Sequence, residues 1–221
     1  MCHTIEHTRR HVHIALPAPR RVLSSAPYHG GWRRADHLLI LGVPDHFDGG
    51  RRPPEPLHVT FDHYCRKNNW NGTIVGMMTS AQMTSFREEG RSELGVEITV
   101  VMTAGISNAR RAGDPAECRT FDQTEETAGT INIIVLTTAR LLPAALVEAA
   151  LVVTEAKAAA LQDLGVVSPV TGKVATGTGT DAVAVVSGDR FPEIRFCGKH
   201  TLFGEMLASA TMAAVRSSLA G

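Results

Sequence analysis

The stretch that decides the fold is KVATGTGTDAVAVV, residues 173–186. Its centre, TGTGTD over 176–181, places three threonine hydroxyls and one carboxylate on a single turn, and an alternating apolar run follows over 182–186. Glycine allows tight or positive-φ backbone, so such a turn can present backbone N–H groups and hydroxyls to a polar ligand. The simpler interpretation is a Gly/Thr turn between two strands, which composition alone favours. Both interpretations place a strand directly after Asp181.

This loop differs from the two best-known glycine loops that bind nucleotides. The chain has no GxxxxGK[ST] motif, which a Walker phosphate loop requires. A GxGxxG motif would need a third glycine at position 182, where the chain has alanine. No acidic residue follows a second strand at the distance that a dinucleotide site requires. A nucleotide site is therefore not expected.

Length and charge limit the class of protein. The chain has 221 residues, 43% of them hydrophobic, which is enough for one sizeable core and a single domain. Lys plus Arg and Asp plus Glu each number 22, so the net charge is zero, which argues against a nucleic-acid or acidic-membrane partner. The sequence shows no apolar run long enough for a membrane span and no secretory signal at its N-terminus, so we expect a cytoplasmic location.

Nine of the ten histidines lie in the first 63 residues. His11 and His13 alternate and would share one face of a strand, which is one way to build a metal site. However, Arg9, Arg10 and the nearby terminus favour a solvated arm. We therefore predict a flexible histidine-rich arm over residues 1–13, a single domain over 14–221 and no metal site. The four cysteines (Cys2, Cys65, Cys118 and Cys197) are far apart and form no CxxC pair, so we expect reduced structural thiols.

Segments whose apolar residues fit a strand alternate along the chain with segments whose apolar residues repeat at helical spacing. Together they predict a mixed α/β (α+β) single domain, layered as a sheet-and-helix sandwich. A short extended run is expected on either side of Pro17 and Pro19, and the Pro/Gly-rich segment 44–56 is a plausible hinge or lid. The expected strands are 36–43, 73–79, 95–104, 129–138, 181–186 and 191–196, and the expected helices are 57–69, 143–164 and 200–219.

Polar residues at the predicted strand ends are candidates for a site. Ser24 and Ser25 precede a glycine pair, and Ser107 and Asn108 directly follow the 95–104 strand, where α/β sheets often place their chemistry. Ordinary explanations are a hairpin corner for the serines and a helix N-cap for the 107–108 pair.

Asn132 and His200 are two further candidates for the site, whereas Glu155 and Lys157 are not. Asn132 falls inside an apolar strand, where an asparagine must find hydrogen-bond partners or cost stability. His200 is the only histidine after residue 63, which makes it the acid–base candidate in this half. Glu155 and Lys157 lie two residues apart on a predicted helix and do not face each other, so we interpret both as solvated charges.

From Leu23 onward the chain resembles the adenosylcobinamide amidohydrolase family. The combination of GTINII, EAKAAAL and ATGTGTD in this order is highly specific, although no single piece is. The matching stretches are LSSA at 23–26 with GG at 30–31, GMMTSA at 76–81, VMTAGISNARRAGD at 101–114, GTINIIVLT at 129–137, TEAKAAALQDLGV at 154–166, ATGTGTDAVAV at 175–185 and CGKHTLFGEM at 197–206.

This resemblance implies hydrolysis of one amide in a corrinoid. Adenosylcobinamide would be cleaved to adenosylcobyric acid and 1-aminopropan-2-ol, so that an incomplete corrinoid re-enters coenzyme B12 assembly. The cobalt belongs to the substrate, and no protein cofactor is expected. A non-catalytic corrinoid carrier and a metal-dependent hydrolase using the N-terminal histidines are the alternatives. A weaker likeness to self-processing aminopeptidase and ornithine acetyltransferase folds implies an α-β-β-α form of the sandwich.

Amide hydrolysis needs a nucleophile, oxyanion donors and an acid for the leaving amine. In one hypothesis His200 is the base, oriented by Asp181 or Glu205, water attacks directly, and the 176–181 loop with Asn132 or Asn108 stabilises the oxyanion. In the other, a hydroxyl of Ser24, Ser25, Ser107 or Thr178 attacks first. The expected catalytic residues are His200, Asp181, Glu205 and Asn132, and the expected substrate-binding residues are Ser24, Ser25, Gly30, Gly31, Thr79, Ser107, Asn108, Thr176, Gly177, Thr178, Gly179 and Thr180.

Overall fold

The computed structural model describes residues 3–43, 56–117 and 130–220. Its centre is a mixed sheet of eight strands in the order β4-β3-β2-β11-β8-β6-β5, with β1 paired to β2 off this path. These strands are β1 (Thr4–His7), β2 (His11–Ser24), β3 (Gly31–Gly42), β4 (Ile74–Thr79), β5 (Arg87–Glu93), β6 (Val96–Ala104), β8 (Ile131–Thr137) and β11 (Ala182–Val186). Two small pairs join β7 (Ala109–Arg110) to β10 (Gly177–Thr178) and β9 (Ala139–Leu141) to β12 (Arg190–Ile194).

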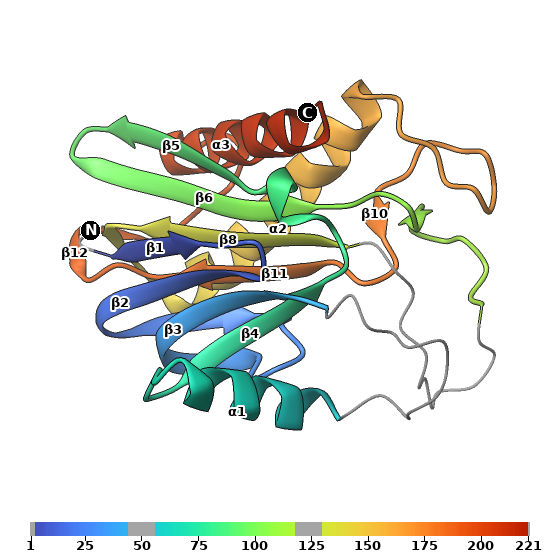
Figure 1. Cartoon of the computed structure of the whole chain (residues 1–221). Coiled ribbons are helices and arrows are strands. Elements are labelled where there is room, and N and C mark those ends of the chain that lie inside the picture. Colours follow the sequence, from blue (N-terminus) through green and yellow to red (C-terminus); the bar gives the residue numbers. More distant parts are fainter. Residues whose placement is uncertain (1–2, 44–55, 118–129, 221) are drawn as a thin grey trace.

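The sheet folds over itself, so that the molecule has four layers (Figure 1). Strands β2, β3 and β4 form one sheet layer, and β11, β8, β6 and β5 form the other. Helices α2 (Pro143–Asp163) and α3 (Leu202–Leu219) cover the second layer, and α1 (Leu57–Lys67) covers the first. The predicted mixed α/β class is confirmed, in the α-β-β-α form. The helices and apolar strands expected from the sequence are also present, with ends that differ by a few residues.

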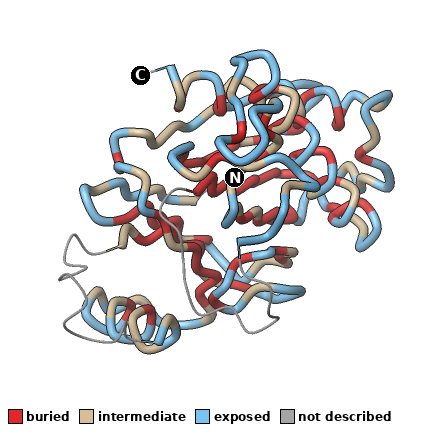
Figure 2. Tube along the Cα trace, turned by 90° about the vertical axis from the view of Figure 1, so that its right-hand side faces the viewer, coloured by how far each residue is buried: buried red, intermediate tan, exposed pale blue. Residues whose placement is uncertain are grey.

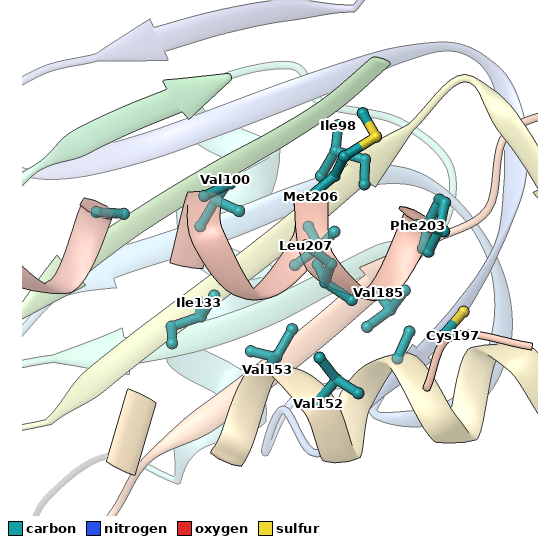
Figure 3. Packing of buried hydrophobic residues seen from close by; sticks show 14 of the residues in the cluster. Ile98, Val100, Ile133, Val152, Val153, Val185, Cys197, Phe203, Met206 and Leu207 are labelled. Carbon is teal, nitrogen blue, oxygen red and sulfur yellow. The ribbon is translucent and has the colours of Figure 1, made fainter. Parts of the chain in front are cut away.

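Three apolar clusters fill the spaces between these layers. One lies between the two sheet layers and contains Ile40, Met77 and Ile134. A larger one lies between the second layer and its helices and contains Ile133, Val153 and other residues that Figure 3 shows packed together. A small one lies under α1. Strand β8 is buried along its whole length because both of its faces are covered, which explains its continuous apolar sequence. Figure 2 shows the buried residues concentrated in the interior of the molecule and the exposed ones at its periphery.

Two of the longer strands, β2 and β5, differ from the expectation. β2 is one continuous strand, because its two prolines fall where its register with β3 shifts between Ala15 and Arg20. β5, with the sequence REEGRSE, was not predicted because it lacks apolar alternation. It is at one edge of the sheet, where charged side chains discourage pairing with another chain.

The predicted flexible arm is wrong for the part of it that the structure describes. Residues 4–7 form β1, and β2 begins at His11 rather than after residue 13. His11 and His13 share a face, as expected, but that face is buried. Tyr64 of α1 and Trp70 of the turn after this helix pack against the two imidazoles. The segment 44–55, most of the expected hinge or lid, lies outside the described residues.

The described cysteines are buried free thiols. Burial raises the pKa of Cys65 to about 11 and the pKa of Cys197 to about 12. Such thiols are poor nucleophiles near neutral pH, which fits the structural role expected for them. Cys2 and Cys118 lie outside the described residues. None of the helices among the described residues has the length and hydropathy to cross a membrane.

His13 is the most perturbed of the buried histidines. Its ring stacks on Trp70 with centroids 3.7 Å apart, and its Nε2 is 3.1 Å from His37 Nδ1. Burial, followed by repulsion from His37 and His11, lowers the pKa of His13 from 6.5 to about 4. The folded protein therefore holds this imidazole neutral at a pH where the unfolded chain protonates it.

This difference makes stability depend on pH. The contribution of neutral His13 is complete above pH 6.5 and decreases as the pH falls towards 4, because only the unfolded state binds a proton in that window. The loss should be on the order of 3 kcal/mol. Urea denaturation at several pH values should show this slope in the unchanged protein and a flatter one in His13→Gln. Parallel slopes in the two proteins would contradict this account.

Candidate functional site

Polar side chains gather at one end of the sheet, on the right in Figure 1, where β4 and β6 end and β8 and β11 begin. Strand register places Asn132 of β8 between Thr103 of β6 and Ala182 of β11. The Asn132 side-chain amide donates to the Met78 carbonyl oxygen at 2.7 Å, and this bond joins β8 to the end of β4 across the two sheet layers. The expectation that a buried asparagine finds a partner is thus confirmed for its amide nitrogen.

The TGTGTD loop reaches this end of the sheet and is held by the Asp181 carboxylate. Oδ1 accepts hydrogen bonds from the Ile131 N–H at 3.0 Å and from the Thr178 hydroxyl at 2.5 Å. Oδ2 accepts from the Thr178 N–H at 3.0 Å and pairs with Lys157 Nζ. One carboxylate therefore ties the loop to β8 and to α2 at the same time.

Lys157 is not a solvated charge, so the interpretation from the sequence is wrong for this residue. Its side chain is 7% exposed, and its ammonium group pairs with Asp181 beneath α2. The signal was present in the sequence, because Lys157 lies four residues from both Val153 and Leu161, on the buried face of the helix. Glu155, in contrast, is exposed and pairs with Lys199.

Gly177 is required by space rather than by backbone dihedral angles. A Cβ atom at this position would lie 2.3 Å from Asp181 Oδ2 and 2.7 Å from Lys157 Nζ. Any side chain would therefore push the two charged groups apart. Of the two glycines in the loop, Gly177 is buried against the ion pair and Gly179 is exposed.

The loop is also held on its other side. The Thr130 hydroxyl donates to the Thr180 carbonyl oxygen at 2.7 Å, and the Thr176 hydroxyl accepts from the Ala112 N–H at 2.8 Å. Pairing of β10 with β7 places Thr178 opposite Ala109. This pairing brings the preceding turn, with the predicted residues Ser107 and Asn108, next to the loop.

The serine corner lies beside the start of β11. The Ser24 hydroxyl donates to the Val183 carbonyl oxygen and accepts from the Ala26 N–H, both at 2.9 Å. The Ser25 hydroxyl accepts from the Val183 N–H at 3.0 Å. These bonds fix the corner, as the hairpin interpretation expects. Gly30 is packed so tightly that a Cβ atom would lie 2.1 Å from the Ala26 carbonyl oxygen, and Gly31 has a φ of +80°.

His200 and Glu205 lie elsewhere. The side chains of His200 and of Glu148 of α2 both lie beside Gly198. Asp181, in contrast, pairs with Lys157, nine residues further along that helix. Nine residues of α-helix span roughly 14 Å. His200 and Glu205 are exposed at the start of α3. The predicted orientation of His200 by Asp181 is therefore not found.

A comparison with known families agrees with the sequence motifs. Residues 2–221 match the model of a family described as adenosylcobinamide amidohydrolase. The chain belongs to the adenosylcobinamide amidohydrolase family. The family resemblance inferred from the motifs is confirmed, and it extends to the N-terminal strands that the sequence interpretation had left out.

Individual relatives share different parts of the chain. A Methanosarcina mazei protein named adenosylcobinamide amidohydrolase is 29% identical over 204 residues, 88% of each chain. Uncharacterized protein MJ1613 of Methanocaldococcus jannaschii is 41% identical over 96 residues, which are 43% of this chain and only 37% of that protein. The crystal structure of the PH0078 protein from Pyrococcus horikoshii superposes with a TM-score of 0.41 at 12% identity, covering 99% of this chain and 82% of that one, which is too weak to assign a fold or a function.

The structure thus brings most of the predicted residues of this amidohydrolase family member to one end of the sheet. Thr79, at the end of β4, is buried and accepts from the Ala81 N–H at 3.0 Å. Lys157, Thr103 and Thr130 belong to the same end but were not predicted. Across the described ranges 3–43, 56–117 and 130–220, no group of three or more His, Cys, Asp or Glu side chains is placed to hold a metal ion.

The Lys157–Asp181 pair should be essential for stability. Lys157→Met leaves a buried carboxylate without its cation, so we expect a loss of about 3–5 kcal/mol in the free energy of unfolding. Lys199→Met is the matched control. It removes the exposed partner of Glu155 and should cost less than about 1 kcal/mol. Denaturant unfolding compares the two, and equal losses would show that the buried pair is not special.

Proposed function

We propose that this protein hydrolyses the amide bond of adenosylcobinamide, releasing adenosylcobyric acid and 1-aminopropan-2-ol. The observation that carries the proposal is the match of the family model to residues 2–221. The related Methanosarcina mazei protein is named adenosylcobinamide amidohydrolase. The reaction would return an incomplete corrinoid to coenzyme B12 assembly in the cytoplasm. Cobalt enters as part of the substrate, and the proposal includes no protein cofactor.

The strand end offers a hydroxyl and a carboxylate in contact. Thr178 is partly exposed, and its hydroxyl donates to Asp181 Oδ1 at 2.5 Å. Ser24 and Ser25, two of the other predicted nucleophiles, bond instead to the Val183 backbone. A hydroxyl already donating to a carboxylate has a base for its proton. Thr178 is therefore our candidate for the attacking group.

The reaction then proceeds in two steps. Thr178 Oγ attacks the amide carbon while Asp181 accepts the hydroxyl proton. The C–N bond breaks, the amine leaves with that proton, and an ester to Thr178 remains. Water then attacks the ester, Asp181 accepts a proton from the water and returns it to Thr178 Oγ, and adenosylcobyric acid is released. Exposed backbone N–H groups of the loop, such as that of Gly179, are candidates to bind the oxyanion.

Direct attack by water is the alternative, with either Asp181 or His200 as the base. Asp181 is the better candidate for this base, because it belongs to the loop whose backbone N–H groups would bind the oxyanion. Among the described residues, no hydrogen bond or ion pair joins the His200 imidazole to a carboxylate, so the role of His200 as base rests on the sequence alone. The three possibilities predict different behaviour of single variants.

The activity itself is tested with the purified protein and adenosylcobinamide, with and without a chelator. Mass spectrometry should detect adenosylcobyric acid and 1-aminopropan-2-ol in equal amounts in both samples. Tight binding of the corrinoid without either product would favour the carrier function. Loss of product only with the chelator would contradict the proposal that the protein needs no metal.

The nucleophile is tested by variants assayed for turnover. Thr178→Ala should lower kcat by about 10²-fold or more, whereas Thr178→Ser, which keeps the hydroxyl, should retain most of it. His200→Ala should remain close to the unchanged protein. If Thr178→Ala is nearly normal, water attacks directly, and if His200→Ala is inactive, the site has been placed at the wrong end of the molecule.

A further inference from the structure

Among the residues that the structure describes, two polar atoms at the same end of the sheet have no hydrogen-bond partner. They are the Thr103 hydroxyl oxygen and the Asn132 side-chain carbonyl oxygen, and both are fully buried. The Met78 carbonyl oxygen can accept only from the amide nitrogen of Asn132, so the Asn132 carbonyl oxygen points away from Met78. Asn132 Oδ1 is therefore an acceptor without a donor.

The two side chains are neighbours. Thr103 and Asn132 are direct partners in the antiparallel register of β6 and β8. Directly paired residues have Cβ atoms about 4.5–5.5 Å apart on one face of a sheet. Alternation along the strands puts this pair on the side of Val101 and Ile134, between the two sheet layers. One small polar group can therefore contact both oxygens.

Such a pair is costly unless something binds to it. A buried polar group without a partner destabilises the folded state, because it has lost its hydrogen bonds to water and gained none in the protein. Thr103 is the last residue but one of β6 and Asn132 is the second residue of β8, and Asn132 is also paired with Ala182, the residue after Asp181. The partnerless atoms thus lie next to the loop to which we assign the chemistry. Polar side chains that are buried here without a partner therefore indicate that a ligand binds to them.

We propose that Thr103 and Asn132 form a subsite for the hydroxyl group of the aminopropanol arm of the substrate. The hydroxyl donates its proton to Asn132 Oδ1 and accepts from the Thr103 hydroxyl, so both protein atoms gain a partner. The inference rests on the proposed function, because it places the leaving-group end of the same substrate. It makes Thr103 and Asn132 specificity-determining residues beside the reacting group at Thr178.

The test uses Thr103→Val, an isosteric change that removes only the hydroxyl. Since this hydroxyl has no partner within the described part of the chain, thermal stability should be unchanged or higher. The affinity for adenosylcobinamide should fall about three- to tenfold, as expected for one lost hydrogen bond. Thr137→Val is the matched control on β8. The Thr137 hydroxyl donates to the Glu97 carbonyl oxygen at 2.9 Å and accepts from the Ala139 N–H, so this variant should lose stability and keep its affinity.

A second ligand identifies the group that is bound. In an analogue with propylamine in place of aminopropanol, the hydroxyl is absent, so Thr103→Val should bind it as well as the unchanged protein does. Weaker binding of both compounds would overturn the assignment to the hydroxyl. Unchanged affinity for adenosylcobinamide, or a stability loss like that of Thr137→Val, would overturn the subsite. Failure of the unchanged protein to bind any corrinoid would overturn the proposed function as well.

Discussion

The ion pair between Lys157 and Asp181 is the constraint on which the candidate site depends. Charges are expensive to bury, and a buried pair is tolerated only where further hydrogen bonds satisfy both groups. Asp181 meets this condition through the backbone N–H groups of Ile131 and Thr178 and the Thr178 hydroxyl. The pair therefore fixes three elements at once, because it connects helix α2, the first residues of β8 and the loop that leads into β11. Gly177 belongs to the same constraint, since any side chain there would occupy the space of the two charged groups.

A loop fixed in this way is suited to chemistry. Catalysis by positioned donors requires that they do not have to reorganise when charge develops on the substrate. Here the loop is anchored from within by Asp181 and at its two flanks by Thr130 and by the short strand pair with β7. The two sheet layers meet at the same point through the bond from Asn132 to Met78, so polar groups from both layers converge on one end of the apolar core. This convergence of polar groups is the reason why we place the proposed reaction at this end of the sheet.

The sequence predicted the parts of the fold in which local pattern and tertiary environment agree. Strand β8 was evident because a strand covered on both faces has an uninterrupted apolar sequence, and α2 was evident from its helical period. β5 was missed because an edge strand can be polar on both faces, and the N-terminal arm was wrong because α1 and the following turn bury His11 and His13 from a distance in sequence. The TGTGTD loop was identified, but its ion-pair partner was not, since Lys157 was compared with Glu155 rather than with the buried face of its own helix. His200 was selected because it is the last histidine in the chain, a property that says nothing about its neighbours in space.

The most direct test of this account is the structure of the protein bound to adenosylcobyric acid, the proposed product. The account predicts that the carboxylate freed by hydrolysis lies at the 176–181 loop, within hydrogen-bond distance of its backbone N–H groups or of the Thr178 hydroxyl. A corrinoid bound at the start of α3, with that carboxylate beside His200 and away from the loop, would contradict it.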